Sequence, residues 1–196
     1  VKDINRRIVS GNIAFNNFKN VWMKGRKISL SRRLKVYDAQ VVSIMLYNSG
    51  CWAAPEHVMN KLDTCHRKHL RSMLNIHWPN RISNEKLYKL TKVKPLTVRV
   101  KEARWKLFGH ILRSSETTPA SLSLMFAADS SSKLRGRRGR HRINLLYMLR
   151  NDLIERKINI KIDCVQDVCR LREIASNRSE WLKLFVLKYD NIGDMT

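Results

Sequence analysis

Acidic residues are scarce in this chain. Its 196 residues include 16 Asp and Glu against 39 Lys and Arg, which gives a formal net charge of +23 at pH 7. The sequence has no Asp-Asp doublet and no cluster of carboxylates, so the paired acids that hold two metal ions in polymerases are missing. A glycine-rich phosphate loop of the Walker type is missing as well. We therefore expect a chain that is not an enzyme on its own and that has no cofactor.

Cysteine and long apolar runs are also scarce. The four cysteines are not spaced like the disulfide framework of a small secreted domain, so we expect reduced thiols in a nuclear or cytoplasmic setting. No apolar run approaches the roughly 20 residues that span a bilayer. The chain starts at Val1 without an initiator Met or an apolar signal core, and its first residues read as a helix already under way. This start indicates an excised piece of a longer protein.

Apolar residues recur at steps of three and four, the period of an amphipathic helix. Strand signals are poor, because no Asn-Gly or Asp-Gly dipeptide joins two alternating runs. The predicted fold class is therefore all-α, a helical bundle followed by a smaller helical unit. Long helices are expected from Ser29 to Met45, after Pro55, and from Pro95 to Arg113, the first of them burying Leu30, Leu34, Tyr37, Val41, Ile44 and Met45. Shorter helices are expected over 4–22, 84–91, 119–127, 141–156, 163–175 and 178–188.

One segment interrupts the helical pattern. Residues 129–142 are polar, small and basic, which predicts a flexible linker. The linker separates a larger amino-terminal helical part from a carboxy-terminal helical unit over 143–196. Within the larger part we expect a helical bundle over 1–74 and a helical connection, packed on that bundle, over 75–128.

The positive charge is clustered as well as abundant. The clusters comprise Lys24, Arg26, Lys27, Arg32, Arg33 and Lys35; then Arg67, Lys68 and Arg71, with Arg81 beyond them; and finally Lys133, Arg135, Arg137, Arg138, Arg140 and Arg142. Such runs bind phosphates with release of counterions, so we expect them to contact RNA, an RNA–DNA hybrid or DNA. The alternative is that each cluster is an ordinary solvated helix face. A membrane-surface role is less favoured, because the basic linker has no adjacent bulky apolar face to insert.

Tryptophan offers two interpretations. An indole stacks on an unpaired base, but more often it anchors a core at the end of a helix. We expect core positions for Trp22, Trp52, Trp105 and Trp181. For Trp78, which lies in a loop, both roles remain open.

A metal site is not expected, although one weak alternative exists. Histidine and cysteine gather at Cys51, His57, Cys65, His66, His69 and His77. Cys65 and His69 lie four residues apart on one side of a predicted helix, so a zinc site built from Cys51, Cys65, His66 and His69 is geometrically workable. The chain has no Cys-x-x-Cys pair, however, and both residues fall on the stripe assigned to the core. Cys164 and Cys169 are five apart and are expected to point in different directions.

Five short motifs occur in order between residues 4 and 185. The first is Leu30-Ser31-Arg32-Arg33-Leu34-Lys35-Val36-Tyr37 with Leu46-Tyr47-Asn48-Ser49-Gly50-Cys51-Trp52, and the second is His66-Arg67-Lys68-His69-Leu70-Arg71-Ser72-Met73-Leu74 with Trp78, Arg81, Ser83 and Asn84. The third is Arg104-Trp105-Lys106-Leu107-Phe108-Gly109-His110-Ile111-Leu112-Arg113. The fourth is Arg137-Arg138-Gly139-Arg140 leading to Asp152-Leu153, and the fifth is Arg178-Ser179-Glu180-Trp181. Together they resemble the region downstream of the palm in non-LTR, LINE-like, endonuclease-bearing retrotransposon reverse transcriptases. The chain departs from that pattern at Asn48, where Gly is usual, at His141, where Pro is usual, and at Leu145, where an aromatic is common.

The resemblance implies that residues 1–74 form a helical thumb, which in such enzymes packs against the minor groove of the primer–template duplex. The remainder would grip template RNA or target DNA. The palm and fingers, with the metal-binding aspartates, would precede Val1 and be the protein partner; no membrane partner is expected. Two alternatives remain open: this region completes an active polymerase from which it has been separated, or it is a domesticated RNA-binding module. In each case we expect a nuclear or cytoplasmic ribonucleoprotein.

Overall fold

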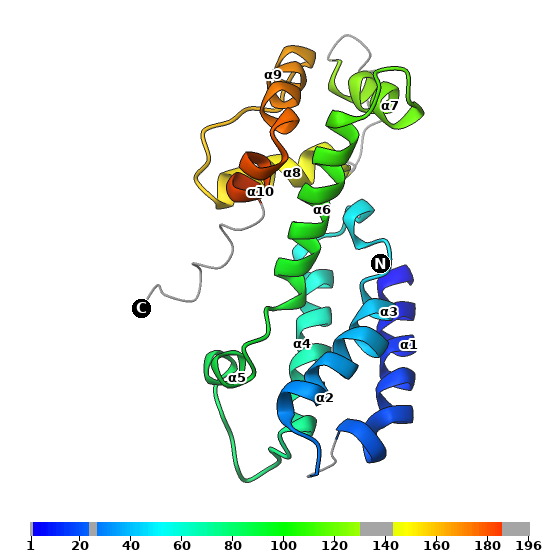
Figure 1. The fold of residues 1–196 in the computed structure, drawn as a ribbon, viewed down its shortest axis with the longest axis vertical. Coiled ribbons are helices and arrows are strands. Elements are labelled where there is room, and N and C mark those ends of the chain that lie inside the picture. The colour runs from blue at the N-terminus through cyan, green and yellow to red at the C-terminus, as the bar shows by residue number, and fades with distance from the viewer. Residues whose placement is uncertain (1, 24–26, 130–142, 186–196) are drawn as a thin grey trace. The chain divides into compact units, whose positions relative to one another are not determined.

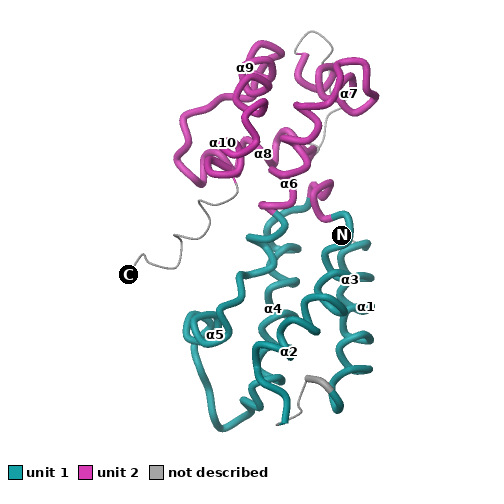
Figure 2. Tube along the Cα trace, viewed as in Figure 1, with its two compact units in different colours: residues 1–48, 54–100 teal, residues 49–53, 101–196 magenta. Residues whose placement is uncertain are grey.

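The computed structural model describes residues 2–23, 27–129 and 143–185, and this part of the chain is helical without any strand (Figure 1). The predicted all-α fold is confirmed. The chain forms two compact units (Figure 2): the amino-terminal unit is Val1–Asn48 with Ala54–Val100, and the carboxy-terminal unit is Ser49–Ala53 with Lys101–Thr196. The division falls inside helix α6, whereas the sequence suggested divisions near residue 74 and at 129–142. Residues 130–142 of the predicted linker lie outside the described residues.

The amino-terminal unit is built on two antiparallel helical stretches and a third long helix. α1 (Lys2–Phe18) is extended by a π-helical turn at Lys19–Met23. α2 (Leu30–Tyr37) continues through a second π-helical turn, Asp38–Val42, into the short α3 (Ser43–Met45) and returns along α1 (Figure 1).

The third long helix is α4 (Glu56–Met73), which packs on α1 and on the π-helical turn at the end of α1. α5 (Asn84–Thr91) lies against α4 and begins at a Ser83 cap, whose hydroxyl accepts from the Lys86 amide. The first residues of α6 (Leu96–Arg113) complete this unit.

The core of the amino-terminal unit follows the predicted stripes with one exception. Tyr37, Val41 and Met45 are buried as expected and Leu30 and Leu34 are half-buried, so the exception is Ile44, which is 40% exposed. The exception has a local cause, because the π-helical turn Asp38–Val42 holds extra residues per turn and so rotates the side chains of α3 about the helix axis. On α4, Cys65 and His69 are buried, as expected from their place on the core stripe, and Val58, Leu62 and Met73 are buried with them.

Asp63 on α4 supplies the cap for a helix more than thirty residues away. Its Oδ1 accepts from the backbone amides of Leu96 and Thr97 at 2.6 and 3.1 Å, and its Oδ2 accepts from the Thr97 hydroxyl at 2.6 Å. These amides are the free donors of the first turn of α6, so a buried carboxylate satisfies them. This cap fixes the start of α6 on α4.

The carboxy-terminal unit contains the rest of α6 and four further helices. These are α7 (Pro119–Ala128), α8 (Leu145–Glu155), α9 (Val165–Ser176) and α10 (Arg178–Phe185). The Thr118 and Asn144 side chains cap α7 and α8 by accepting from the amides of Ser121 and Tyr147. The predicted helix ranges agree with these bounds to within a few residues.

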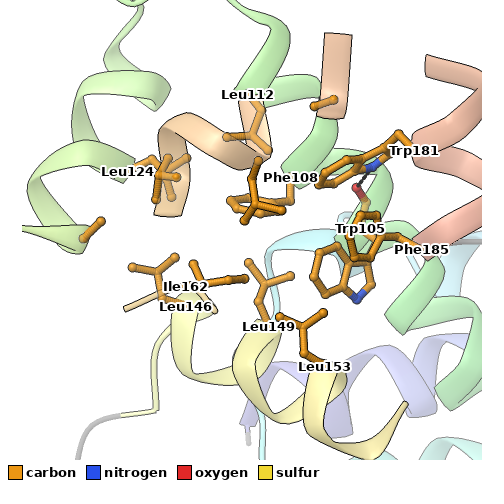
Figure 3. Packing of buried hydrophobic residues seen from close by; sticks show 14 residues of the cluster. Trp105, Phe108, Leu112, Leu124, Leu146, Leu149, Leu153, Ile162, Trp181 and Phe185 are labelled. Atoms are coloured by element: carbon orange, nitrogen blue, oxygen red, sulfur yellow. Dashed lines mark hydrogen bonds between the residues drawn. The ribbon is translucent and has the colours of Figure 1, made fainter. Parts of the chain in front are cut away.

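The described core of this unit combines aliphatic side chains with the aromatic rings of Trp105, Phe108, Trp181 and Phe185 (Figure 3). Trp105 stacks on Phe185 with ring centroids 4.4 Å apart, and Trp181 lies 4.4 Å from the same ring. Trp105 and Trp181 are 0% and 1% exposed, which confirms the core positions predicted for them. Trp52 is half-buried, and the Trp22 side chain lies outside the described residues.

The fifth sequence motif packs on the third within this unit. The Trp181 indole N–H donates to the Trp105 carbonyl at 3.0 Å, and its ring lies directly over Gly109 (Figure 3 shows the hydrogen bond). A Cβ on Gly109 would lie 2.3 Å from Trp181 Nε1. Glycine is therefore required at this helical position by the indole that covers it.

Gly109→Ala is expected to destabilise the protein by about 1–3 kcal/mol, because the gain in helix propensity is outweighed by a clash in a close-packed core. Urea unfolding monitored by tryptophan fluorescence would measure the loss. The Trp181→Phe change shortens the side chain that clashes, so the two substitutions together should cost less than the sum of each alone. Strict additivity would contradict the proposed contact.

Candidate nucleic-acid interface

The predicted phosphate-binding residues fall into described and undescribed groups. Those outside the described residues are Lys24, Arg26, Lys133, Arg135, Arg137, Arg138, Arg140 and Arg142, and their roles stay predictions. Those that the structure describes are the exposed Lys27, Arg32, Lys35, Lys68 and Arg81, and the half-buried Arg33, Arg67 and Arg71. All of the described residues belong to the amino-terminal unit.

The end of α4 determines where the next loop lies. Asn75 adopts a left-handed conformation with φ 57°, and its amide donates to the Ser72 carbonyl at 3.2 Å. The Ile76 amide donates to the Arg71 carbonyl at 2.9 Å. This pair of bonds is a Schellman motif, which ends the helix and turns the chain back across its last turn. Ile76, His77 and Trp78 are thereby brought beside the polar side of α4.

A concave pocket of about 660 Å³ lies at this place, and we call it the α4 pocket. Its cationic and aromatic lining consists of Lys19, Arg67, Lys68, Arg71, His77 and Trp78. The rest of the lining is Thr64, Ser72, Ile76 and Asn84, so none of the described residues that line it carries a carboxylate. A hollow with several cations and no acid attracts anions.

The guanidinium groups of this pocket are positioned by neutral partners. Arg71 Nη2 donates to Asn84 Oδ1 at 2.7 Å and so ties α4 to the start of α5. Arg67 Nη2 donates to the Thr64 hydroxyl at 3.1 Å, one turn earlier on α4. Across the described ranges, no carboxylate forms an ion pair with Arg67, Lys68 or Arg71. No carboxylate of the described ranges therefore neutralises their charge, which leaves it available to a ligand.

Other arginines of the chain are used differently. Arg99 pairs with Asp38, and Arg172 pairs with Glu116. Arg33, whose phosphate contact stays a prediction, donates from Nη1 to the Met73 carbonyl at 2.6 Å and so closes the last turn of α4. Several acidic residues thus pair with arginines or lysines elsewhere, and among the described residues no carboxylate pairs with a cation of the α4 pocket.

Trp78 is 80% exposed, which makes it the most exposed of the described large hydrophobic side chains. The sequence left its role open between core packing and base stacking, and the structure places it at the wall of the α4 pocket. Core packing does not apply to this residue. Sites for single-stranded nucleic acid combine exposed aromatic side chains with cations in this way.

The structure brings together some of the predicted residues and not others. Arg67, Lys68 and Arg71 share the α4 pocket, whereas Lys27, Arg32 and Arg81 do not line it. Lys35 lines a separate hollow of about 530 Å³ between α2 and the end of α5. Lys19 and His77 were not assigned to nucleic acid from the sequence, because only the packing of the turn after α1 and the reversal after α4 bring them to the pocket.

The residues of the weak zinc alternative form a hydrogen-bond network instead. The Tyr37 hydroxyl lies 2.9 Å from His66 Nδ1 and 3.2 Å from His69 Nδ1. His69 Nε2 lies 2.9 Å from Asn12 Oδ1, which also accepts from the Cys65 thiol at 3.2 Å. Cys51 belongs to the carboxy-terminal unit, and the described residues hold no group of three or more potential ligands that could bind a metal. A zinc site at these residues is not supported.

Burial shifts the titration of every ionisable member of this network. Loss of solvent lowers the pKa of His66 to about 3 and that of His69 to about 4. The same loss raises the pKa of the Cys65 thiol to about 11 and raises the pKa of the Tyr37 phenol well above its usual value. The network is therefore neutral at pH 7, which suits a structural role.

No protein-family model, no curated protein and no solved structure matches this chain. None of the helices in the described ranges combines the length and the apolar character that crossing a bilayer requires.

Proposed function

We propose that this chain binds nucleic acid through phosphate contacts and performs no catalysis by itself. The observation that carries the proposal is the α4 pocket, whose cations have no carboxylate partner among the described residues although the chain contains 16 acidic residues. A net charge of +23 supports the same conclusion, since self-repulsion of this size is relieved by a polyanion.

We further propose that the chain is the thumb and carboxy-terminal region of a non-LTR retrotransposon reverse transcriptase. The support is the order of the five sequence motifs, together with an all-helical fold of the kind expected for a thumb. In this role the chain would hold primer–template duplex or template RNA for a palm located elsewhere in the parent protein.

The test of phosphate binding compares two double variants of equal charge. Arg67→Gln with Lys68→Gln removes two cations from the α4 pocket and leaves the Arg71–Asn84 bond in place. Lys61→Gln with Lys86→Gln removes two exposed cations that do not line the pocket. Fluorescence anisotropy with labelled RNA, titrated over a range of salt concentrations, gives the affinity and its salt slope for each protein.

The pocket variant is expected to weaken binding for all sequences and to reduce the salt slope by about two, one for each lost phosphate contact. The control variant is expected to change the slope much less. Equal effects of the two variants would show that only net charge matters and would refute the assignment to the α4 pocket. A wild-type affinity that does not vary with salt would refute phosphate binding altogether.

A further inference from the structure

We propose that the α4 pocket takes an unpaired nucleotide, with its base stacked on Trp78 and its phosphates on the cations of α4. This inference rests on the proposed nucleic-acid binding and goes one step further, because it names the form of the ligand. The site would prefer single-stranded RNA or DNA, a loop or an overhanging end to a fully paired duplex.

The exposure of Trp78 is the first reason to expect an unpaired base. An indole that is 80% exposed offers its face to a ligand rather than to the core. The bases of a paired helix are stacked on each other and have no free face to give to a loop side chain, whereas an unpaired base does. The indole beside the cations therefore favours a ligand that contains an unpaired base.

The charges beside Trp78 carry the second step. Arg71 is held by Asn84, and Arg67 by Thr64, so two guanidinium groups are fixed on the same side of α4 before any ligand arrives. Lys68 and Lys19 add flexible cations to the same hollow. A planar aromatic wall joined to preordered phosphate donors matches the two chemical parts of a nucleotide.

The size of the hollow is the third step. Its volume of about 660 Å³ falls within the range of about 300–1,000 Å³ that small-molecule sites occupy. A nucleotide is a ligand of this class, while a duplex is far wider than the pocket and would only cross its rim.

An acidic peptide would also be attracted to these cations, but the arrangement favours a nucleotide. Carboxylate side chains need only the charges, and they leave the exposed indole unused. Competition therefore separates the two ligands: poly-glutamate is expected to displace RNA only weakly and without dependence on Trp78.

The experiment measures binding of the full chain to an oligouridine RNA and to a blunt, fully paired RNA duplex of the same length. Trp78→Ala is expected to weaken oligouridine binding roughly 5- to 150-fold, which corresponds to about 1–3 kcal/mol of stacking. Duplex binding is expected to change less than twofold. Trp78→Phe keeps an aromatic face and is expected to recover most of the loss.

A second readout locates the contact. Oligonucleotides that contain 5-bromouracil crosslink to stacked aromatic side chains under ultraviolet light, and peptide mass spectrometry is expected to find the crosslink at Trp78. No crosslink at Trp78, or an equal loss for both ligands in Trp78→Ala, would overturn the inference. If poly-glutamate competes strongly and in a Trp78-dependent manner, the pocket serves an acidic peptide, which also overturns it.

Failure of this inference is distinguishable from failure of the proposed function. If binding depends on salt and is reduced by Arg67→Gln with Lys68→Gln but not by Trp78→Ala, the phosphate site is supported and only the binding of an unpaired base is contradicted. The absence of salt-dependent binding to either RNA would contradict both this inference and the proposed function.

Discussion

Asp152→Asn is expected to lower the free energy of unfolding by about 3–5 kcal/mol, the largest loss that we expect from a single substitution. Asp152 Oδ2 lies 2.7 Å from Arg104 Nη1, and the two side chains are 2% and 1% exposed. Asparagine preserves the shape of the aspartate but not its charge. The Arg104 guanidinium would remain buried in the carboxy-terminal unit without a counter-ion.

The rest of the site does not compensate for this loss. Among the described residues, the guanidinium forms one other hydrogen bond, from Nη2 to the Trp52 carbonyl at 3.4 Å. Burial raises the pKa of the Asp152 carboxyl, and Arg104 opposes that rise, so the ionised carboxylate depends on the guanidinium beside it. The pair and the bond to Trp52 join α6, α8 and the segment Ser49–Ala53 within one unit.

The control is a surface pair on the same two helices. Lys101 of α6 pairs with Glu155 of α8, where the carboxylate is 57% exposed, so Glu155→Gln is expected to cost less than about 1 kcal/mol. The double variant Arg104→Met with Asp152→Leu removes both buried charges and is expected to recover most of the stability lost in Asp152→Asn. Urea unfolding followed by tryptophan fluorescence measures all of them. A cost for Asp152→Asn no larger than that for Glu155→Gln would contradict the stabilising role of the buried pair.

This buried pair also shows where local sequence patterns stop being informative. The helices themselves were predictable, because apolar spacing and short polar caps are local signals that survive into the fold. Arg104 and Asp152 are 48 residues apart, and nothing local to either indicates that both are buried. An arginine in a helical pattern is normally assigned to the solvent side.

The candidate interface was predictable only where its residues lie close together in the sequence. Arg67, Lys68 and Arg71 lie within about one helical turn, so their common side followed from spacing. Lys19 joins them only through tertiary packing, and Trp78 joins them through the reversal at Asn75. The motif residues Arg104, Gly109 and Trp181 contact one another or other buried residues. At these three positions the motif therefore reflects the packing of the core.

Lowering the pH from 7 to 4.5 is expected to cost the folded protein about 3–5 kcal/mol through His66 and His69 alone. Both histidines have folded-state pKa values of about 3 and 4, below the value of about 6.5 in an unfolded chain. The unfolded state therefore binds more protons than the folded state in this window. The stabilisation is complete above about pH 6.5 and is lost as the pH falls towards the folded pKa values.

The hydrogen-bond network explains why the folded protein does not readily take up a second proton on His69. Asn12 Oδ1 only accepts, so His69 Nε2 must carry the proton, and His69 Nδ1 is left to accept from the Tyr37 hydroxyl. A second proton on His69 would occupy Nδ1, so the Tyr37 hydroxyl could no longer donate to that atom and the network would have to rearrange. His69 is 4% exposed and stacks on Phe15 at 4.1 Å, so the added charge would find little solvent.

Two variants separate the histidine effect from the titration of carboxylates. The double variant His66→Asn with His69→Gln keeps polar groups near the same positions but does not titrate, and it should lose about 3–5 kcal/mol less than wild type between pH 7 and 4.5. His57→Asn, at an exposed position on the same helix, should retain the full wild-type loss. Urea unfolding followed by far-ultraviolet circular dichroism at both pH values supplies the comparison. If wild type and the double variant lose the same stability, the acid sensitivity lies elsewhere, because only the buried histidines differ between them.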